Sequence, residues 1–495
     1  MNAVRSTVGI AAAAVALTFT GVASAQTPTP TVVDPKLKVE PVVTGLNQPV
    51  QMQFIGKDDF FVLEKPTGIV KRVKDGVATP VLDLTVNFAS ERGLLGIALD
   101  KHFKFNGTVY LYWSETTLPT DNNDLSAVPT LGNRLDRYHW DGTSLTFEKT
   151  IHRGRSFQAD PGQPVRGNHN GGVLRVGPDG KIYLQVGDTG RRGQMQNLID
   201  GPFVFPLPAT NDGSIGDDQF GGPDPDAAHL TGVILRLNPD GTAPRDNPFY
   251  RLGAERGGSV GASLKKVYGY GIRNGFGMAF DPFSGDLWEQ ENGDDSFSEI
   301  NRVEEGFNGG WVQLMGPLSR VSQYRAIETT VTPTPPDPNA ATYYGLQQLR
   351  WDPANIAANP HEAYDRMFKL PGSRYSDPEM SWKYEVAPGG IDFLSSRELG
   401  KDYRGDLFVG SARGALRNGN LFRLPISNNR KEVDPEDRRL KDKVADNLHK
   451  YEITESESLL FGENFGVTPD LRESPDGTLY VVSSSQNTVY EISAE

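Results

Sequence analysis

A four-residue pattern recurs six times along this chain and limits the folds that the chain can adopt. The pattern is a glycine, a polar residue, an aliphatic residue and an aromatic residue, and a looser copy, Asp58–Phe61, comes first. The other copies begin at Gly107, Gly180, Gly285, Gly405 and Gly477. Turn sequences such as GPDG and SPDG precede most copies, and an apolar run precedes each turn. Turn residues between β-branched and aromatic runs are typical of β-hairpins, so the pattern predicts six hairpin units.

Radial repetition of such units predicts an all-β fold, a six-bladed β-propeller with long loop insertions. The copies are unevenly spaced, which places the insertions at about residues 200–232 and 314–378. A short helix is expected within the second insertion, near HEAYDRMF. The alternating segment LKVEPVV, residues 37–43, is expected to pair with TVYEI in the last unit and close the ring. An open β-sandwich, or a pair of β-domains, is the alternative arrangement of these strands.

The first residues are typical of a secretory signal peptide, which is expected to span residues 1–25. Arg5 gives a charged start, Val8 to Gly21 is apolar, and Ala23-Ser24-Ala25 supplies a small-residue cleavage site. The apolar stretch is shorter than the ~20 residues that a membrane-spanning helix needs. We therefore expect a Thr/Pro-rich leader over residues 26–36 and a propeller over residues 37–495, in the periplasm or secreted, with no membrane span.

Composition excludes two kinds of chemistry. The formal net charge of −13 argues against nucleic acid as a partner, because nucleic acid attracts basic surfaces. The chain has no cysteine, so it can form neither disulfides nor a thiol nucleophile.

Hairpin geometry brings ionisable residues together. Residues equidistant from the turn of an antiparallel hairpin face each other, which places His169 opposite Asp188 around a turn near Asp179. The same reasoning places Arg273 and Asn274 opposite the segment 291–293. Glu91 enters the second unit at the corresponding open end. Because these ends meet at one rim of a propeller, the sequence predicts a polar site at the mouth of the central channel.

The residue types at this rim suit proton transfer. Asp188 would accept a hydrogen bond from one nitrogen of the His169 ring and leave the other as a free base. Arg273 would offer five donors to a developing oxyanion, and the glycines around His169 would let a flat ligand approach. The alternatives are an ordinary Asx-turn at Asp188 with a solvated histidine, and an Arg273 that only pairs with Glu291.

Four longer segments carry a family signal. They are NHNGGVLRVGPDGKIYLQVGD, YGIRNGFGMAFDPFSGDLWEQENGDDSFSEIN, ERGLLGIALD and SPDGTLYVV. They resemble the soluble quinoprotein glucose/sorbosone dehydrogenases, including the aldose sugar dehydrogenases, and the resemblance runs from about residue 42 to the C-terminus. It implies a six-bladed propeller that binds pyrroloquinoline quinone (PQQ) and Ca²⁺. It also implies oxidation of a sugar or another alcohol by hydride transfer to PQQ, and a separate electron acceptor.

The resemblance also implies roles for individual residues. His169 would be the base, Asp188 would orient it, and Arg273 would polarise the quinone oxygen. Further cofactor contacts would come from Glu91, Asn274 and Arg413, and Trp382 would lie near the substrate mouth. The backbone carbonyls of Gly293 and Asp294 would hold the calcium ion, in line with the preference of Ca²⁺ for oxygen ligands.

Two positions depart from the family's pattern. In the segment VTPDL, Val467 and Pro469 replace two arginines that hold the cofactor carboxylates, and Arg472 or Lys383 are the candidates to compensate. Glu385 stands where the family has a small hydroxyl residue. These departures leave two alternatives to the dehydrogenase: a calcium-dependent, lactonase-like hydrolase, and a non-catalytic propeller that binds a glycan or a protein.

Overall fold

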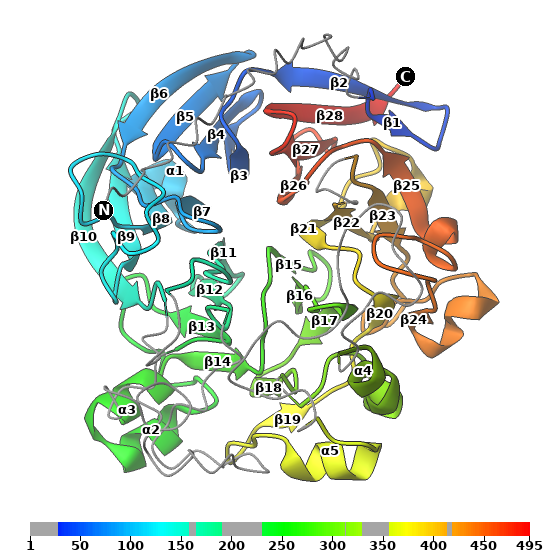
Figure 1. The fold of residues 1–495 in the computed structure, drawn as a ribbon. Helices are drawn as coiled ribbons and strands as arrows, with labels where there is room; N and C mark the ends of the chain where they lie inside the picture. Colours follow the sequence, from blue (N-terminus) through cyan, green and yellow to red (C-terminus); the bar gives the residue numbers. More distant parts are fainter. Residues whose placement is uncertain (1–27, 158–164, 191–229, 312, 329–355, 413–417) are drawn as a thin grey trace, which may run out of the picture.

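Six β-sheets are arranged in a ring around a central channel (Figure 1). The computed structural model describes residues 28–157, 165–190, 230–311, 313–328, 356–412 and 418–495. The inner strands of neighbouring sheets contact each other around the whole ring, in the order β3, β7, β11, β15, β21 and β26, and β26 contacts β3. The fold is therefore the six-bladed β-propeller that the repeats predict.

The first three blades follow one another along the chain. The first consists of β3 (Pro49–Gly56), β4 (Asp59–Glu64), β5 (Ile69–Lys74) and β6 (Val77–Asp83). The second consists of β7 (Leu94–Leu99), β8 (Thr108–Ser114), β9 (Asn133–Trp140) and β10 (Leu145–Gly154). The third consists of β11 (Val173–Val176), β12 (Ile182–Val186), β13 (Val233–Leu237) and β14 (Val267–Tyr270), extended by β18 (Phe307–Asn308) and β19 (Arg374–Tyr375).

The remaining blades take strands from more distant parts of the chain. The fourth consists of β15 (Gly277–Phe280), β16 (Leu287–Glu291), β17 (Ser296–Val303), β20 (Met380–Tyr384) and β24 (Val444–Ala445). The fifth consists of β21 (Pro388–Phe393), β22 (Leu407–Ser411), β23 (Leu421–Leu424), β25 (Leu460–Glu463) and β1 (Thr31–Val32). The sixth consists of β26 (Asp470–Glu473), β27 (Leu479–Ser483), β28 (Thr488–Ala494) and β2 (Leu37–Val43).

The two ends of the chain close the ring. Strand β2, near the N-terminus, pairs antiparallel with the C-terminal strand β28, with Val39 opposite Ile492. This is the pairing that the alternating segment 37–43 predicts. Strand β1 pairs with β25, so Thr31 and Val32 of the expected leader attach to the outer edge of the fifth blade. The expected signal peptide lies outside the described residues.

Each copy of the repeated pattern leads into the second strand of one blade: β4, β8, β12, β16, β22 or β27. Successive side chains of such a strand point to opposite faces and pack between neighbouring blades. In β12, for example, Ile182 and Leu184 pack against the second blade and Tyr183 against the fourth. The apolar core is thus divided into clusters between consecutive blades. The repeated pattern specifies the fold because it supplies apolar side chains to both faces of the second strand of each blade.

Helices are short and lie outside the blades: α1 (Phe103–Asn106), α2 (Tyr250–Arg256), α3 (Gly258–Leu264), α4 (Val321–Glu328) and α5 (Pro360–Arg366). Helix α5 falls where the sequence predicts a helix in the second insertion. Most of the first insertion, residues 200–229, lies outside the described residues. Within the described ranges, no helix combines the length and the apolar composition needed to cross a membrane.

Candidate active site

A cavity of about 700 Å³ opens at one end of the central channel. Residues within three positions of the start of each of the six inner strands line it: Gln51, Leu95, Val173, Phe276, Pro388 and Pro469. His169, Arg273, Asn274 and Glu91 belong to the same lining. Tertiary structure therefore brings together the rim residues that the hairpin geometry predicts.

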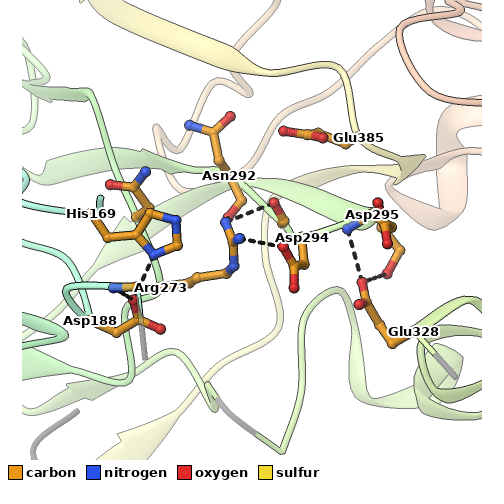
Figure 2. A network of polar contacts seen from close by, with 12 residues as sticks. His169, Asp188, Arg273, Asn292, Asp294, Asp295, Glu328 and Glu385 are labelled. Carbon is orange, nitrogen blue, oxygen red and sulfur yellow. Dashed lines mark hydrogen bonds and ion pairs between the residues drawn. The ribbon is translucent and has the colours of Figure 1, made fainter. Parts of the chain in front are cut away.

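The centre of the site is a histidine–carboxylate pair (Figure 2). The Nδ1 atom of His169 lies 2.6 Å from the Oδ1 atom of Asp188, beyond the open end of the β11–β12 hairpin, so the predicted contact between these two residues is confirmed. The Gly190 N–H also donates to Oδ1, over 2.8 Å, and the Trp311 indole N–H donates to Oδ2, over 2.9 Å. His169 has a left-handed backbone, with φ 55°, which is uncommon for a residue other than glycine.

The neighbours of Asp188 keep it ionised. Burial alone would raise the pKa of this carboxyl, but the charge and hydrogen bond of His169, the charge of Arg273 and the Gly190 N–H outweigh that effect. The pKa of Asp188 is therefore below its ordinary value. An ionised acceptor at Nδ1 keeps the proton of a neutral histidine on that atom and leaves Nε2 as the basic nitrogen.

Glu91 connects three blades at the rim. Its Oε2 atom accepts the backbone N–H of His169, over 2.7 Å, and the side-chain amide of Asn274, over 3.2 Å. The Oδ1 atom of Asn274 is buried and has no hydrogen-bond partner among the described residues. An unpaired buried acceptor is costly, so this atom is suited to meet a donor on a ligand in the cavity.

The Arg273 guanidinium binds backbone and side-chain oxygens of the fourth blade. Its NH1 donates to the carbonyls of Asn292 and Gly293, each over 2.8 Å, and its NH2 pairs with Asp294 over 2.6 Å. The side chain also lies over the Trp311 ring, 5.7 Å from its centre. Glu291 accepts the backbone N–H of Arg273 rather than its guanidinium, so the alternative of a simple Arg273–Glu291 ion pair is wrong.

A second buried cation, Lys450, lies beside this group and was missed by sequence reasoning. Its ammonium is 2.7 Å from the Asp295 carboxylate, 2.9 Å from the Glu385 carboxylate and 3.3 Å from the carbonyl oxygen of Asp294. Burial would lower the pKa of Lys450, but the two carboxylates outweigh it and raise the pKa above its ordinary value. Nothing in the local sequence, NLHKYEI, signals this placement.

The glycines beside His169 have a structural role. Gly171 and Gly172 have positive φ values of 62° and 108°. A Cβ atom on Gly171 would lie 2.4 Å from the Gln185 carbonyl oxygen, and one on Gly172 would lie 2.7 Å from the Leu95 side chain. Backbone conformation and close packing therefore require glycine at both positions, and both residues also line the cavity.

Several expected contacts are not at the cavity. Trp382 is fully buried and packs on Phe422 between the fourth and fifth blades, with 5.4 Å between the ring centres. The prediction that Trp382 lies near the substrate mouth is therefore wrong. Its position in β20 directs the ring into the core between blades. Lys383 and Arg472 are absent from the lining, whereas Val467 and Pro469 belong to it. Arg413 lies outside the described residues.

The quinone ring of PQQ fits this cavity, but the lining offers few cations to bind the PQQ carboxylates. The volume and the unpaired Asn274 oxygen suit a flat, polar ligand. Among the described lining residues, the lysine and arginine side chains are Lys65 and Arg273, and Arg273 already pairs with Asp294. Burial lowers the pKa of Lys65 to about 8. The structure thus supports ring binding more strongly than carboxylate binding.

Calcium does not fit the two carbonyls that the resemblance assigns to it. The Gly293 carbonyl accepts a hydrogen bond from Arg273, and the Asp294 carbonyl accepts one from Lys450. The described ranges also contain no group of three or more His, Cys, Asp or Glu side chains placed to hold a metal ion.

Fold and site together define a propeller with a histidine–aspartate pair at the mouth of its channel. Comparison with known families places the chain more closely: it belongs to the glucose/sorbosone dehydrogenase family, whose model matches residues 46–202 and 213–369.

Individual relatives are distant. An uncharacterised protein of Synechocystis is 26% identical over 464 residues, which cover 92% of this chain and 85% of that protein. Quinoprotein glucose dehydrogenase B of Acinetobacter calcoaceticus is 30% identical over 282 residues, 56% of this chain and about half, 52%, of that enzyme. The PQQ-bound aldose sugar dehydrogenase of Streptomyces coelicolor has a TM-score of 0.53 at 22% identity, covering 94% of this chain and all of that one. The last likeness concerns the fold alone.

Proposed function

We propose that this protein is an exported quinoprotein dehydrogenase that oxidises a hydroxyl group of a sugar or another alcohol. The observation that carries the proposal is the His169–Asp188 pair at the edge of the cavity. Asn274 and Arg273, which lie in the same lining, support it. Membership of the glucose/sorbosone dehydrogenase family supports this reaction class.

His169 would remove the hydroxyl proton of the substrate. Asp188 accepts the Nδ1–H of the ring, so Nε2 is the atom that takes the proton. The imidazolium that forms then lies against an ionised carboxylate, which stabilises it. The Trp311 indole and the Gly190 N–H hold that carboxylate in place while the charge changes. A positioned base of this kind contributes about 10²–10⁴-fold to the rate.

PQQ would supply the hydride acceptor when bound. Asn274 would donate or accept at the polar edge of its ring, and Glu91 would keep Asn274 oriented through the 3.2 Å contact. Lys65, whose ammonium donates to the Ser90 carbonyl over 2.7 Å, is the basic residue of the described lining, besides Arg273, that would stand in for the missing arginines.

The cellular setting belongs to the same proposal. The N-terminal signal peptide, cleaved after Ala25, would direct the protein to the periplasm or beyond the cell. The sequence contains no Cys-x-x-Cys-His motif for haem attachment, because it contains no cysteine. Electrons would therefore pass from the reduced quinone to a separate acceptor.

The test is reconstitution of the purified apoprotein with PQQ. We expect reduction of an artificial dye with at least one of a panel of aldoses and alcohols, and no reduction without PQQ. His169→Ala should remove the activity, whereas His139→Ala, at an exposed histidine on the outer side of the second blade, should keep it. An absence of dye reduction over the whole panel at saturating PQQ would refute the dehydrogenase. Lactone hydrolysis without quinone, or stabilisation by a glycan alone, would favour the two alternatives.

A further inference from the structure

The two carbonyl oxygens that the resemblance assigns to calcium are both in contact with side-chain cations. The Gly293 oxygen accepts from the Arg273 guanidinium over 2.8 Å, and the Asp294 oxygen lies 3.3 Å from the Lys450 ammonium. Arg273 belongs to the family's pattern, but Lys450 does not appear in any of the segments that carry the resemblance. The contact between Lys450 and the Asp294 carbonyl is therefore not implied by the resemblance.

Lys450 is held in this position by several interactions. Its side chain is 8% exposed, and its ammonium contacts the carboxylates of Asp295 and Glu385. Backbone hydrogen bonds connect the same segments. The Tyr451 N–H donates to the Glu385 carbonyl over 2.7 Å, and the Glu385 N–H donates to the Asp295 carbonyl over 3.1 Å. Three separate segments, around residues 295, 385 and 450, are thus tied together around one ammonium group.

The pairing with Glu385 links this lysine to a departure from the family. By the resemblance, Glu385 stands where the family has a small hydroxyl residue. Its carboxylate adds a negative charge to the cavity wall, and Figure 2 shows it in the same view as Asn292 and Asp294. A buried carboxylate requires a compensating charge. Lys450 supplies it at 2.9 Å, and the same ammonium reaches the Asp294 carbonyl. The added carboxylate and the lysine therefore form one unit.

We propose that the Lys450 ammonium is a built-in cation that replaces calcium at the Asp294 carbonyl, so that this site is complete without a metal ion. A calcium ion takes six to eight oxygen ligands at 2.3–2.6 Å and would repel an ammonium that contacts the same oxygen. The lysine is covalently attached, so its occupancy is independent of the calcium concentration. Calcium and Lys450 exclude each other at this oxygen.

The test measures calcium binding rather than turnover. Wild-type protein is treated with a chelator, and calcium is then titrated by calorimetry and by thermal unfolding. We expect Lys450→Met to bind one more calcium ion than the wild type, with a dissociation constant of about 10⁻⁴–10⁻³ M. We also expect calcium to raise the Tm of this variant more than that of the wild type, because Asp295, Glu385 and the Asp294 carbonyl have then lost the Lys450 ammonium.

Lys443→Met is the matched control. Lys443 also contacts two carboxylates, Glu379 at 2.6 Å and Glu432 at 3.7 Å, but it lies away from the cavity. Its removal should create no calcium site. If Lys450→Met alone does not fold, the double variant Lys450→Met with Glu385→Gln restores the local charge balance, and calcium should still raise its Tm more than that of the wild type.

Two results would overturn the inference. One is a Lys450 variant with the same calcium stoichiometry and the same calcium response as the wild type. The other is a wild-type protein whose Tm falls on chelation, recovers with calcium, and loses that recovery in Glu385→Gln. Neither result depends on dye reduction, so the dehydrogenase and the built-in cation fail or succeed separately.

Discussion

The two sides of the cavity differ in the charge they present. One side, the histidine wall, comes from the second, third and fourth blades and consists of Glu91, His169, Arg273 and Asn274. The opposite side, the uncharged wall, comes from the fifth and sixth blades and consists of Ala412, Val467, Pro469, Ser484 and Ser485. The histidine wall contains the groups that the resemblance requires for proton transfer, whereas the uncharged wall has Val467 and Pro469 where the resemblance implies two arginines. Under the proposed function, proton transfer would belong to the histidine wall, and the contacts to the cofactor carboxylates would belong to the uncharged wall.

The largest expected effect is a loss of turnover when the charge behind His169 is removed from the histidine wall. Asp188→Asn keeps the shape of the side chain but removes the charge, and its amide can donate to Nδ1 of His169, which moves the ring proton to Nε2. A wrong tautomer of this kind costs about 10⁴-fold in turnover. Dye reduction at saturating PQQ and substrate measures it. Ser484→Ala, on the uncharged wall, should leave turnover close to that of the wild type, and equal losses in both variants would contradict the division between the walls.

A positive charge added to the uncharged wall tests whether this wall limits the affinity for PQQ. Val467→Arg places a guanidinium where the family has one, and a charge-assisted hydrogen bond is worth about 1.5–3 kcal/mol, or about tenfold to a hundredfold in affinity. We expect PQQ to bind more tightly by that factor, measured by calorimetry. Val467→Gln has a long polar side chain without the charge and should change the affinity little. If both variants bind PQQ equally, charge on this wall does not control cofactor affinity.

Trp311 provides a smaller test of the histidine wall. Its indole N–H donates to Asp188, and Trp311→Phe removes this bond to a charged acceptor, which is worth about 1.5–3 kcal/mol. Trp382→Phe is the control, because the Trp382 indole nitrogen is buried with no hydrogen-bond partner among the described residues. We expect Trp311→Phe to lower the free energy of unfolding more than the control does, measured with denaturant. Equal losses would mean that the bond contributes nothing net.

The smallest expected effect concerns buried acids behind the histidine wall. Burial raises the pKa of Glu289 to about 7 and that of Glu299 to about 8, above the ordinary 4.5. Between pH 4.5 and 8 the folded protein therefore binds more protons than the unfolded chain. The free energy of unfolding should fall as the pH rises through this window.

Glu289→Gln tests that pH dependence. The variant cannot ionise at this position, and the free Oε1 atom of Gln185 can turn to accept from the new amide. We expect a flatter dependence of Tm on pH, with the variant gaining most near pH 8. Glu432→Gln, at an exposed position, should keep the slope of the wild type, and an unchanged slope in Glu289→Gln would remove Glu289 as its cause.

Local sequence determined much of the architecture. The repeated pattern marks the second strand of every blade, and the alternating segment 37–43 identifies the strand that closes the ring. Hairpin register is set by the turn and by side-chain alternation, so the facing of His169 and Asp188 followed from counting residues around Asp179. A family resemblance then attached roles to those residues.

Contacts between blades could not be read in the same way. Trp311 reaches Asp188 across 123 positions in the chain, and Lys450 reaches Asp295 across 155. Trp382 has the residue type expected at a substrate mouth, but its strand turns it into the core. Such contacts depend on how six sheets pack against one another, which no local pattern specifies.

The sequence by itself thus determined the number of blades, the strand that closes the ring and the histidine–aspartate pair, because the strand patterns and the hairpin turn are local features. Tertiary structure alone decided which cations meet the Gly293 and Asp294 carbonyls and how charge is divided between the two walls. The physical reason is that electrostatic neighbours are set by distance in space, and the propeller brings residues from six remote segments to one cavity.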